Sequence, residues 1–234
     1  MLTAAILPVK RLASAKQRLG ASVADPFRVR LARAMVSDVL SALSRASSIE
    51  QVIVVTAEPA VASDARAHGA LVLVDRDEAG QSAAVGIGIK RAMADGLERV
   101  LCVPGDCPAL EPDELDRLLS DARALGGHTD ARAEVVIVPD RHGTGTNALL
   151  LHPPDAIEPS FGPGSCERHL DLARAAGVRW RLEHPPSLLL DVDTGEDLSA
   201  LRAALAGARA SAVRTRSVLE QQEGLAVLSG ATRG

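Results

Sequence analysis

Runs of Val, Ile and Leu without polar alternation limit the possible folds of this chain more than any other feature. Residues 52–55 read Val-Ile-Val-Val, and residues 71–74 and 135–138 have the same character. A strand that is apolar on both faces is typical of a parallel sheet with helices packed on each side. We therefore predict strands at residues 3–9, 51–57, 70–75, 99–106, 134–140, 146–152, 178–184 and 187–193.

Segments with helical periodicity lie between these predicted strands. Phe27, Leu31, Met35 and Val39 recur every fourth residue and so lie along one stripe of a helix. The segment 113–124 begins with acidic residues, which are favourable near a helix N-terminus, and then places several leucines together. This alternation predicts an α/β fold: a mostly parallel mixed sheet, flanked by helices and joined by right-handed crossovers.

The length of 234 residues suits one domain, and a hydrophobic fraction of 47% is enough for a sizeable core. We expect this domain to span residues 1–209, because strand and helix patterns continue to about that point. The pattern weakens over residues 210–234, which we expect to form a tail with a short helix or no fixed structure.

Composition and charge exclude several classes of function. One Trp, two Phe and no Tyr leave few rings on which nucleic-acid bases stack, and the net charge of −4 is unfavourable for binding a phosphate backbone. We therefore expect no nucleic-acid partner. No stretch approaches the ~20 apolar residues that cross a membrane, and the three cysteines have no Cys-x-x-Cys spacing. These features predict a reduced, cytoplasmic protein without a membrane partner.

In open α/β sheets, ligands bind beyond the carboxyl ends of the strands, so the segments that follow the predicted strands are the candidate sites. The segment after the first strand contains Lys10, Arg11, Lys16 and Arg18. It has neither a Walker A loop nor a dinucleotide fingerprint. Basic side chains over a strand end suit a triphosphate. A solvated basic loop is the alternative.

Acidic residues lie at the carboxyl ends of two other predicted strands. Asp106 lies in a turn, where a carboxylate either holds Mg²⁺ or bonds to its own backbone. Asp191 and Asp193 lie two residues apart in a predicted strand and so point to one face. Two like charges on one face repel unless a cation lies near them, which favours a metal site. Thr194 and Asp197 have the spacing of a helix capping box and are interpreted as structural.

The segment 141–151, RHGTGTNALLL, joins two predicted strands through a loop that is longer than a tight hairpin requires. It begins with Arg141 and His142 and is rich in small residues that offer N–H and hydroxyl donors. Such a loop suits an anion, and a flexible connector is the alternative.

Residues 162–165 lead into a predicted helix, whose first N–H groups and dipole favour an anion. Ser165 is alternatively a simple N-cap. Arg168 and His169 fall in the first turn, where a positive charge opposes the dipole. A bound anion would explain both residues, although Glu167 weakens this argument.

Taken in order, these segments resemble the 2-phospho-L-lactate / phosphoenolpyruvate guanylyltransferases of coenzyme F-420 biosynthesis, the CofC/FbiD family. The resemblance covers roughly residues 1–205 and rests on LPVKRLASAKQRL, PGDCPAL, PDRHGTGTNALLL, FGPGSCERH and DVDTGEDL. Each segment alone is weak, whereas the ordered set is specific. The resemblance implies a single-domain, Rossmann-like nucleotidyltransferase fold. The first loop lacks the Gly-Gly signature of the wider superfamily, as is typical of this branch.

The resemblance also implies a role for each segment. The first loop would contact the triphosphate of GTP, and the segment GQSAAV would contact the base. The implied catalytic residues are Lys10, Lys16, Arg18 and Asp106. The implied nucleotide-binding residues are Pro8, Lys10, Lys16, Gly80, Gln81 and Ser82. The implied ligands of Mg²⁺ are Asp106 and Asp193, with Asp191 as a helper. The phosphorylated three-carbon acid would meet Thr146, Gly162 and Ser165, with Arg141, His142 and Arg168 near its anionic groups.

The implied reaction joins GMP from GTP to phosphoenolpyruvate and releases pyrophosphate. A phosphate monoester is largely ionised at pH 7, so this reaction requires no general base. The close alternative acceptor is 2-phospho-L-lactate. Another acceptor for a transferase of the same fold, and a non-catalytic nucleotide-binding module, also remain open. Handover of a labile product to the next enzyme of the pathway is a further expectation.

Overall fold

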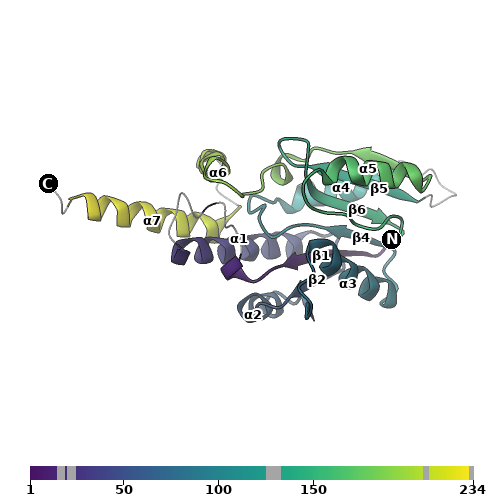
Figure 1. Cartoon of the computed structure of the whole chain (residues 1–234), viewed down its shortest axis with the longest axis horizontal. Helices are drawn as coiled ribbons and strands as arrows, with labels where there is room; N and C mark the ends of the chain where they lie inside the picture. Colours follow the sequence, from purple (N-terminus) through teal and green to yellow (C-terminus); the bar gives the residue numbers. More distant parts are fainter. Residues whose placement is uncertain (15–18, 20–24, 125–132, 208–210, 232–234) are drawn as a thin grey trace.

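The computed structural model describes residues 1–14, 19, 25–124, 133–207 and 211–231 (Figure 1). Lys16 and Arg18 of the predicted triphosphate loop therefore lie outside the described residues. Within the described part, one sheet has the strand order β3-β2-β1-β4-β6-β5-β7. The strands are β1 (Thr3–Val9), β2 (Gln51–Thr56), β3 (Leu71–Val74), β4 (Arg99–Cys102), β5 (Glu134–Pro139), β6 (Thr146–His152) and β7 (Arg179–Leu182).

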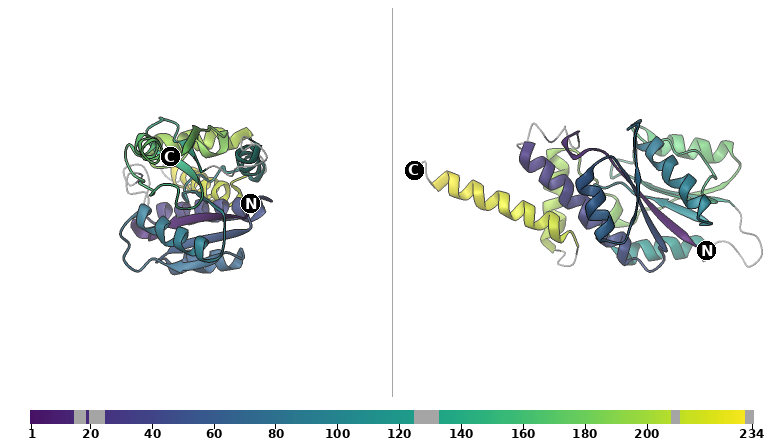
Figure 2. Two further views of the ribbon diagram at one scale, coloured as in Figure 1. Left: turned by 90° about the vertical axis from the view of Figure 1, so that its right-hand side faces the viewer. Right: turned by 90° about the horizontal axis from the view of Figure 1, so that it is seen from below.

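Helices cover both faces of this sheet (Figures 1 and 2). They are α1 (Asp25–Arg45), α2 (Pro59–Ala67), α3 (Gln81–Ala94), α4 (Pro112–Ala124), α5 (Ser165–Ala175), α6 (Gly195–Gly207) and α7 (Val213–Ala231), with short 3₁₀ helices η1 (Leu12–Ser14) and η3 (Pro186–Leu188). The predicted α/β architecture with flanking helices is confirmed.

Strand direction places one end of β6 beside the carboxyl ends of the other strands. β6 pairs antiparallel with β4 and β5, whereas every other described pair in the sheet is parallel. The predicted mostly parallel mixed sheet is therefore confirmed. Because only β6 runs in the opposite direction, its first residue, Thr146, lies at the edge where the other strands end.

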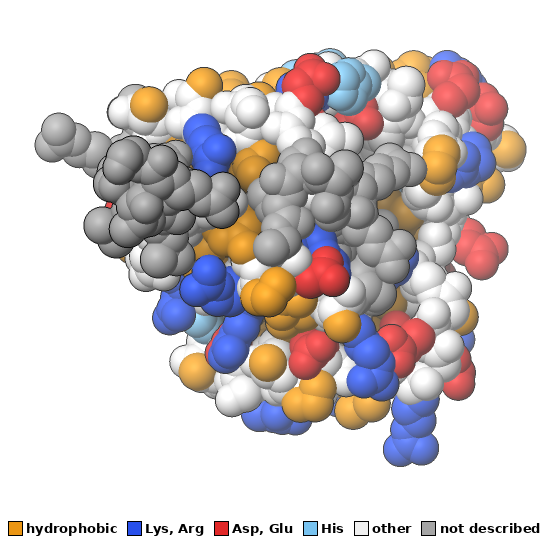
Figure 3. All heavy atoms as spheres, turned by 60° about the vertical axis from the view of Figure 1, so that its left-hand side comes forward, with side chains coloured by type: hydrophobic (Ala, Val, Ile, Leu, Met, Phe, Trp, Pro, Cys, Tyr) orange, Lys and Arg blue, Asp and Glu red, His pale blue; other side chains and the backbone are white. Residues whose placement is uncertain are grey.

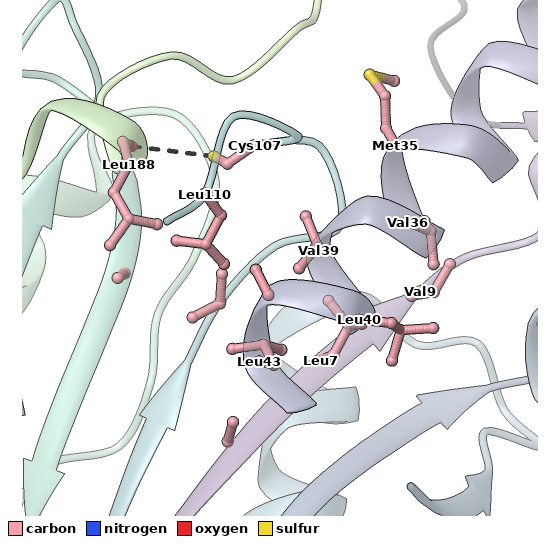
Figure 4. Close-up of a cluster of buried hydrophobic side chains, with 14 of the residues drawn as sticks. Leu7, Val9, Met35, Val36, Val39, Leu40, Leu43, Cys107, Leu110 and Leu188 are labelled. Atoms are coloured by element: carbon pink, nitrogen blue, oxygen red, sulfur yellow. Dashed lines mark hydrogen bonds between the residues drawn. The ribbon is translucent and has the colours of Figure 1, made fainter. Parts of the chain in front are cut away.

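The central strands β1, β2, β4, β5 and β6 bury both faces, as their unbroken apolar runs predict, whereas the outermost strands β3 and β7 are more exposed. In β1, Leu7 and Val9 contribute to the apolar cluster that also contains α1, while Ile6 contributes to the cluster on the opposite face with α3. Figure 4 shows Leu7 and Val9 beneath Val36 and Leu40 of α1. Burying an aliphatic side chain of this size stabilises the fold by about 1.5–3 kcal/mol. These layers form the rigid base from which the site loops emerge.

The predicted strand at residues 187–193 is wrong. Its first residues belong to η3, and the rest of the segment pairs with no strand. Two of its backbone groups are bonded elsewhere: the Leu188 carbonyl accepts from the Asn147 side chain, and the Val192 N–H donates to the Asp106 carbonyl. The Asn147 side chain and the loop at Asp106 thus supply the hydrogen-bond partners that a neighbouring strand would otherwise supply. Periodicity in the sequence does not reveal such partners.

The tail expected at residues 210–234 includes the helix α7. Its first turn is held by Asp38 of α1, whose carboxylate accepts the N–H groups of Arg214 and Thr215. Leu219 is buried in the main core. Figures 1 and 2 show the later part of α7 extending beyond the rest of the molecule. No helix among the described residues combines the length and hydropathy that a membrane span requires. The domain boundary at residue 209 stays a prediction.

Two glycines of α3 provide a matched test of the packing between α3 and β1. A Cβ atom at Gly88 would lie 2.6 Å from Cγ2 of Ile6, whereas a Cβ atom at Gly86 would have no atom of another element within 4 Å. Ile6 is fully buried and has a stiff, β-branched side chain.

We predict that Gly86→Ala raises the free energy of unfolding by about 0.5–1 kcal/mol through helix propensity. Gly88→Ala should instead lower it by about 1–2 kcal/mol, because the clash with Ile6 outweighs the same propensity gain. Urea unfolding of the two variants and the wild type measures this difference. A stabilised Gly88→Ala variant would contradict the packing described for α3.

Candidate active site

A cleft of about 320 Å³ lies beyond the carboxyl ends of β1 and β4, between α1 and the start of α3. The predicted residues that line it are Pro8, Lys10, Gly80, Gln81, Asp106 and Asp193. They come from four separate parts of the sequence, so the fold brings the basic loop, the Gly80 segment and the acidic residues together. Figure 3 shows both acidic and basic side chains among the described residues of the face that it draws.

Two acidic residues of the cleft were not among the sequence-predicted site residues. Asp75 and Glu78 line it between β3 and α3. Asp75 accepts the N–H of Glu78 at 3.0 Å, and Glu78 forms an ion pair with Arg11 at 2.8 Å. This pair connects the first loop to the segment before Gly80. Their signal in the sequence is their position at or just beyond the end of a predicted strand, and the acidic residues at 106 and 193 also end predicted strands.

Asp106, Asp191 and Asp193 form an acidic cluster. Each offers a carboxylate oxygen, and these oxygens all lie within 4.8 Å of one another. Burial, followed by the charge of Asp106, raises the pKa of Asp191 above its ordinary value. Oxygen ligands at this spacing suit a hard divalent cation, which would relieve the repulsion among them. The residues present therefore fit the expected Mg²⁺ site, and the metal itself stays a prediction.

Asn147 holds one member of this cluster in place. Its side-chain N–H groups donate to Asp191 Oδ1 at 3.2 Å and to the Leu188 carbonyl at 2.8 Å. The same carbonyl accepts from Cys107 Sγ, as Figure 4 shows. Sequence reasoning missed Asn147, although a polar residue inside the apolar run of β6 was a visible signal. It connects the acidic cluster to the strand that begins at Thr146.

The capping box at the start of α6 has the predicted structural role. Asp197 Oδ2 accepts the N–H of Thr194 at 2.8 Å, and the Thr194 hydroxyl accepts the N–H of Asp197 at 3.3 Å. Arg141 forms ion pairs with Asp197 at 2.6 Å and Glu196 at 3.3 Å, and its Nε donates to His142. The charge of Arg141 is thus engaged at the end of α6, and contact of Arg141 and His142 with an acceptor stays a prediction.

The loop of residues 141–145, which is rich in Gly and Thr, lies beside the start of α5, as the sequence suggested. The Cys166 N–H donates to the Thr144 carbonyl at 3.1 Å, and Thr146 Oγ1 lies 3.0 Å from His169 Nδ1. Thr146 and Ser165 are both buried, and the Ser165 N–H donates to the Gly162 carbonyl. Three of the predicted acceptor-binding residues, Thr146, Gly162 and Ser165, therefore lie in one small region at the start of β6.

Arg168 and His169 are used differently from the sequence expectation. Arg168 donates to Ser160 through Nε and Nη2 and to the Pro163 carbonyl through Nη1, so it holds the loop before α5. His169 has no exposed surface, and burial lowers its pKa to about 4. The expected positive charge on His169 is therefore wrong, because the ring is neutral near pH 7. An anion is not needed to explain this residue.

His169 makes the stability of the protein depend on pH in a defined window. Its folded-state pKa of about 4 lies below the ordinary value of 6.5. Between these values the unfolded chain binds a proton that the folded chain does not. Lowering the pH through this window should therefore reduce the free energy of unfolding by about 3 kcal/mol, at roughly 1.4 kcal/mol for each unit of pKa shift.

Urea unfolding between pH 4 and pH 7 measures this effect. His169→Gln should remove this part of the pH dependence, and His184→Gln, at an exposed position, serves as the control. Other titrating groups are common to wild type and variants and cancel in the comparison. Equal pH dependence in the wild type and in His169→Gln would contradict the buried, neutral state of the ring.

Solved structures share this fold. A protein described as a nucleotide-diphospho-sugar transferase from Desulfovibrio desulfuricans G20 superposes with a TM-score of 0.74 at 18% identity, covering 96% of this chain and 97% of that chain. A cytidylyltransferase from Leptospira borgpetersenii superposes with a TM-score of 0.57 at 13% identity, covering 96% of each chain. At such identities the likeness shows the nucleotidyltransferase fold alone.

Relatives with similar sequences identify the family of this chain. A phosphoenolpyruvate guanylyltransferase from Conexibacter woesei is 48% identical over 221 residues, which is 94% of this chain and 96% of that relative. A phosphoenolpyruvate guanylyltransferase from Sphaerobacter thermophilus is 37% identical, over 86% of this chain and 93% of that relative. The family model described as "Guanylyl transferase CofC like" matches residues 3–212. The chain therefore belongs to the CofC-like guanylyl transferase family.

Proposed function

We propose that this protein transfers GMP from GTP to phosphoenolpyruvate, giving enolpyruvoyl-2-diphospho-5'-guanosine and pyrophosphate in coenzyme F-420 biosynthesis. Family membership supports guanylyl transfer. Relatives that are named phosphoenolpyruvate guanylyltransferases and match most of this chain support the acceptor.

One structural observation carries the proposal: consecutive residues of β6 connect the acidic cluster to the region expected to bind the acceptor. Asn147 donates to Asp191, while the neighbouring Thr146 contacts His169 of α5. Asp106 and Asp193 also line the cleft that contains Lys10. A transferase must bring two anionic substrates to one point, and this arrangement offers a cation site between their expected positions.

We propose that Asp106 and Asp193 bind Mg²⁺, with Asp191 as a helper. Hard oxygen donors at the spacing of this cluster support that assignment. When bound, Mg²⁺ would neutralise negative charge on the phosphates during transfer. Asn147 keeps one carboxylate oxygen of Asp191 directed toward its own side chain, and the Val192 N–H ties the segment between Asp191 and Asp193 to the Asp106 backbone.

In the proposed reaction, a phosphate oxygen of the acceptor forms a bond to the α-phosphorus of GTP. The bond from that phosphorus to the bridging oxygen breaks, and pyrophosphate leaves with the electron pair. The attacking oxygen is already largely ionised at pH 7, so no side chain has to remove a proton. Lys10, with Lys16 and Arg18 of the same loop, would hold the triphosphate, and Thr146, Gly162 and Ser165 would hold the acceptor.

The carboxylate cluster predicts a separation between catalysis and nucleotide binding. We expect Asp106→Asn to reduce the turnover number by about 10²- to 10³-fold, because a group that stabilises the transition state is weakened. The affinity for GTP, measured by isothermal titration calorimetry, should change much less. Asp155→Asn, at an exposed position outside the cleft, is the matched control. A variant at Asp106 with wild-type turnover would exclude a catalytic role for the cluster.

The acceptor is tested by pyrophosphate release from GTP and Mg²⁺, with mass spectrometry of the nucleotide product. We expect pyrophosphate release with phosphoenolpyruvate and a lower kcat/KM with 2-phospho-L-lactate. Because the two acids differ by a small apolar change, their transition-state binding should differ by only about 1–3 kcal/mol. The reverse order of efficiency would favour the second acid. Binding of GTP without product from either acid would overturn the acceptor assignment.

We also propose that the product passes directly to the next enzyme of the pathway, because a phosphate anhydride of this kind is labile. The same assay, repeated in the presence of that enzyme, tests the handover through an increase in product yield. An unchanged yield would contradict direct transfer.

A further inference from the structure

His169 connects two parts of the acceptor region through both of its ring nitrogens. Nδ1 lies 3.0 Å from the hydroxyl of Thr146, and Nε2 accepts the backbone N–H of Ser160 at 2.9 Å. The ring is fully buried, and it packs against Phe161 in a T-shaped arrangement with 5.2 Å between the ring centroids. The imidazole is therefore held on three sides within the fold.

These contacts determine which nitrogen carries the proton. A backbone N–H can only donate, so Nε2 must be the acceptor in its bond with Ser160. In a neutral imidazole the other nitrogen then carries the hydrogen. Nδ1–H consequently donates to Thr146 Oγ1, and the ring holds the Nδ1-protonated tautomer.

The tautomer in turn determines the direction of the Thr146 hydroxyl. A hydroxyl has one proton and two acceptor lone pairs. Because one lone pair of Thr146 receives the Nδ1–H bond, its own proton cannot point at the ring and is directed away from it. Thr146 is thereby prepared as a donor, which is the role that an anionic oxygen requires of it.

We propose that His169 is a positioning residue for acceptor binding: it orients the Thr146 hydroxyl as a donor to an oxygen of the phosphorylated acid. This inference rests on the proposed function, because it takes Thr146 as a contact of the acceptor. His169 itself touches no substrate in this proposal and acts through Thr146.

The same ring also holds the loop that precedes α5. Ser160 is bound by His169 and by two nitrogens of Arg168, and the neighbouring Phe161 N–H donates to Ser82 Oγ at 2.9 Å. Ser82 belongs to α3, whose first residue lines the nucleotide cleft. His169 therefore lies between the acceptor loop and the strand that begins at Thr146, where one ring can align both.

Two substitutions test the two hydrogen bonds of the ring separately. The amide of Gln lies as many bonds from Cβ as Nε2 does, so His169→Gln can keep the Ser160 bond while losing the donor to Thr146. The amide of Asn matches Nδ1, so His169→Asn can keep that donor while losing the Ser160 bond. We expect His169→Gln to raise the KM for the acceptor about tenfold, with the KM for GTP nearly unchanged. His169→Asn should restore most of the acceptor KM.

A double-mutant cycle tests whether His169 acts through Thr146. We expect Thr146→Val to raise the acceptor KM, and the double variant Thr146→Val/His169→Gln to show no further increase. Additive increases would overturn the proposal, and so would equal acceptor KM values in His169→Gln and the wild type. A purely structural role would instead lower Tm and change the kinetics with both substrates in His169→Gln and His169→Asn alike.

The tautomer is measured independently of activity by ¹H–¹⁵N correlation of the histidine rings at pH 7, with His169 assigned by its loss in His169→Gln. The Nδ1-protonated pattern supports the proposal, and an Nε2-protonated or doubly protonated ring overturns it. If the wild type turns over neither acid, the proposed function fails instead. The tautomer measurement would still show whether His169 has the protonation state that the proposal requires.

Discussion

The site depends on one constraint, the direction of strand β6 within an otherwise parallel sheet. β6 pairs antiparallel with both of its neighbours, so its first residues lie at the edge where the other strands end. Alternation along the strand then directs Thr146 toward α5 and Asn147 toward Asp191. A parallel β6 would have carried both residues to the opposite edge, away from the cleft and from the acidic cluster.

Acidic and basic side chains at this edge of the sheet are held by nearby residues. The acidic cluster brings three carboxylates together, and Arg141 is paired with acids of α6. Arg168 is bonded to carbonyl groups and a hydroxyl of the loop before α5. Two of the predicted anion-binding cations are thus engaged in holding the framework. In the proposed reaction, the Thr146 hydroxyl, the basic first loop and a cation at the acidic cluster would attract the anionic substrates.

Local patterns in the sequence were sufficient for the layers of the fold. Apolar runs predicted β1 to β6, because central strands that are buried on both faces leave no polar alternation. The segment of β7 was also predicted, although it alternates polar and apolar residues. The capping box at Thr194 and Asp197 was also predictable from spacing. The segment 187–193 was mistaken for a strand, since its apolar residues pack beside η3 while its backbone bonds to Asn147 and Asp106.

The sequence by itself determined the residue types of the candidate site segments: the basic first loop, Asp106, the pair Asp191 and Asp193, and the glycines before α5. Only the tertiary structure decided the protonation and the orientation of the side chains at the site. His169 read as a cation at a helix start, yet burial against Phe161 and bonding to Ser160 make it neutral. Asn147 read as one polar residue in a strand, yet it orients Asp191. Protonation and orientation depend on distant partners and on exclusion of water, which spacing along a chain does not specify.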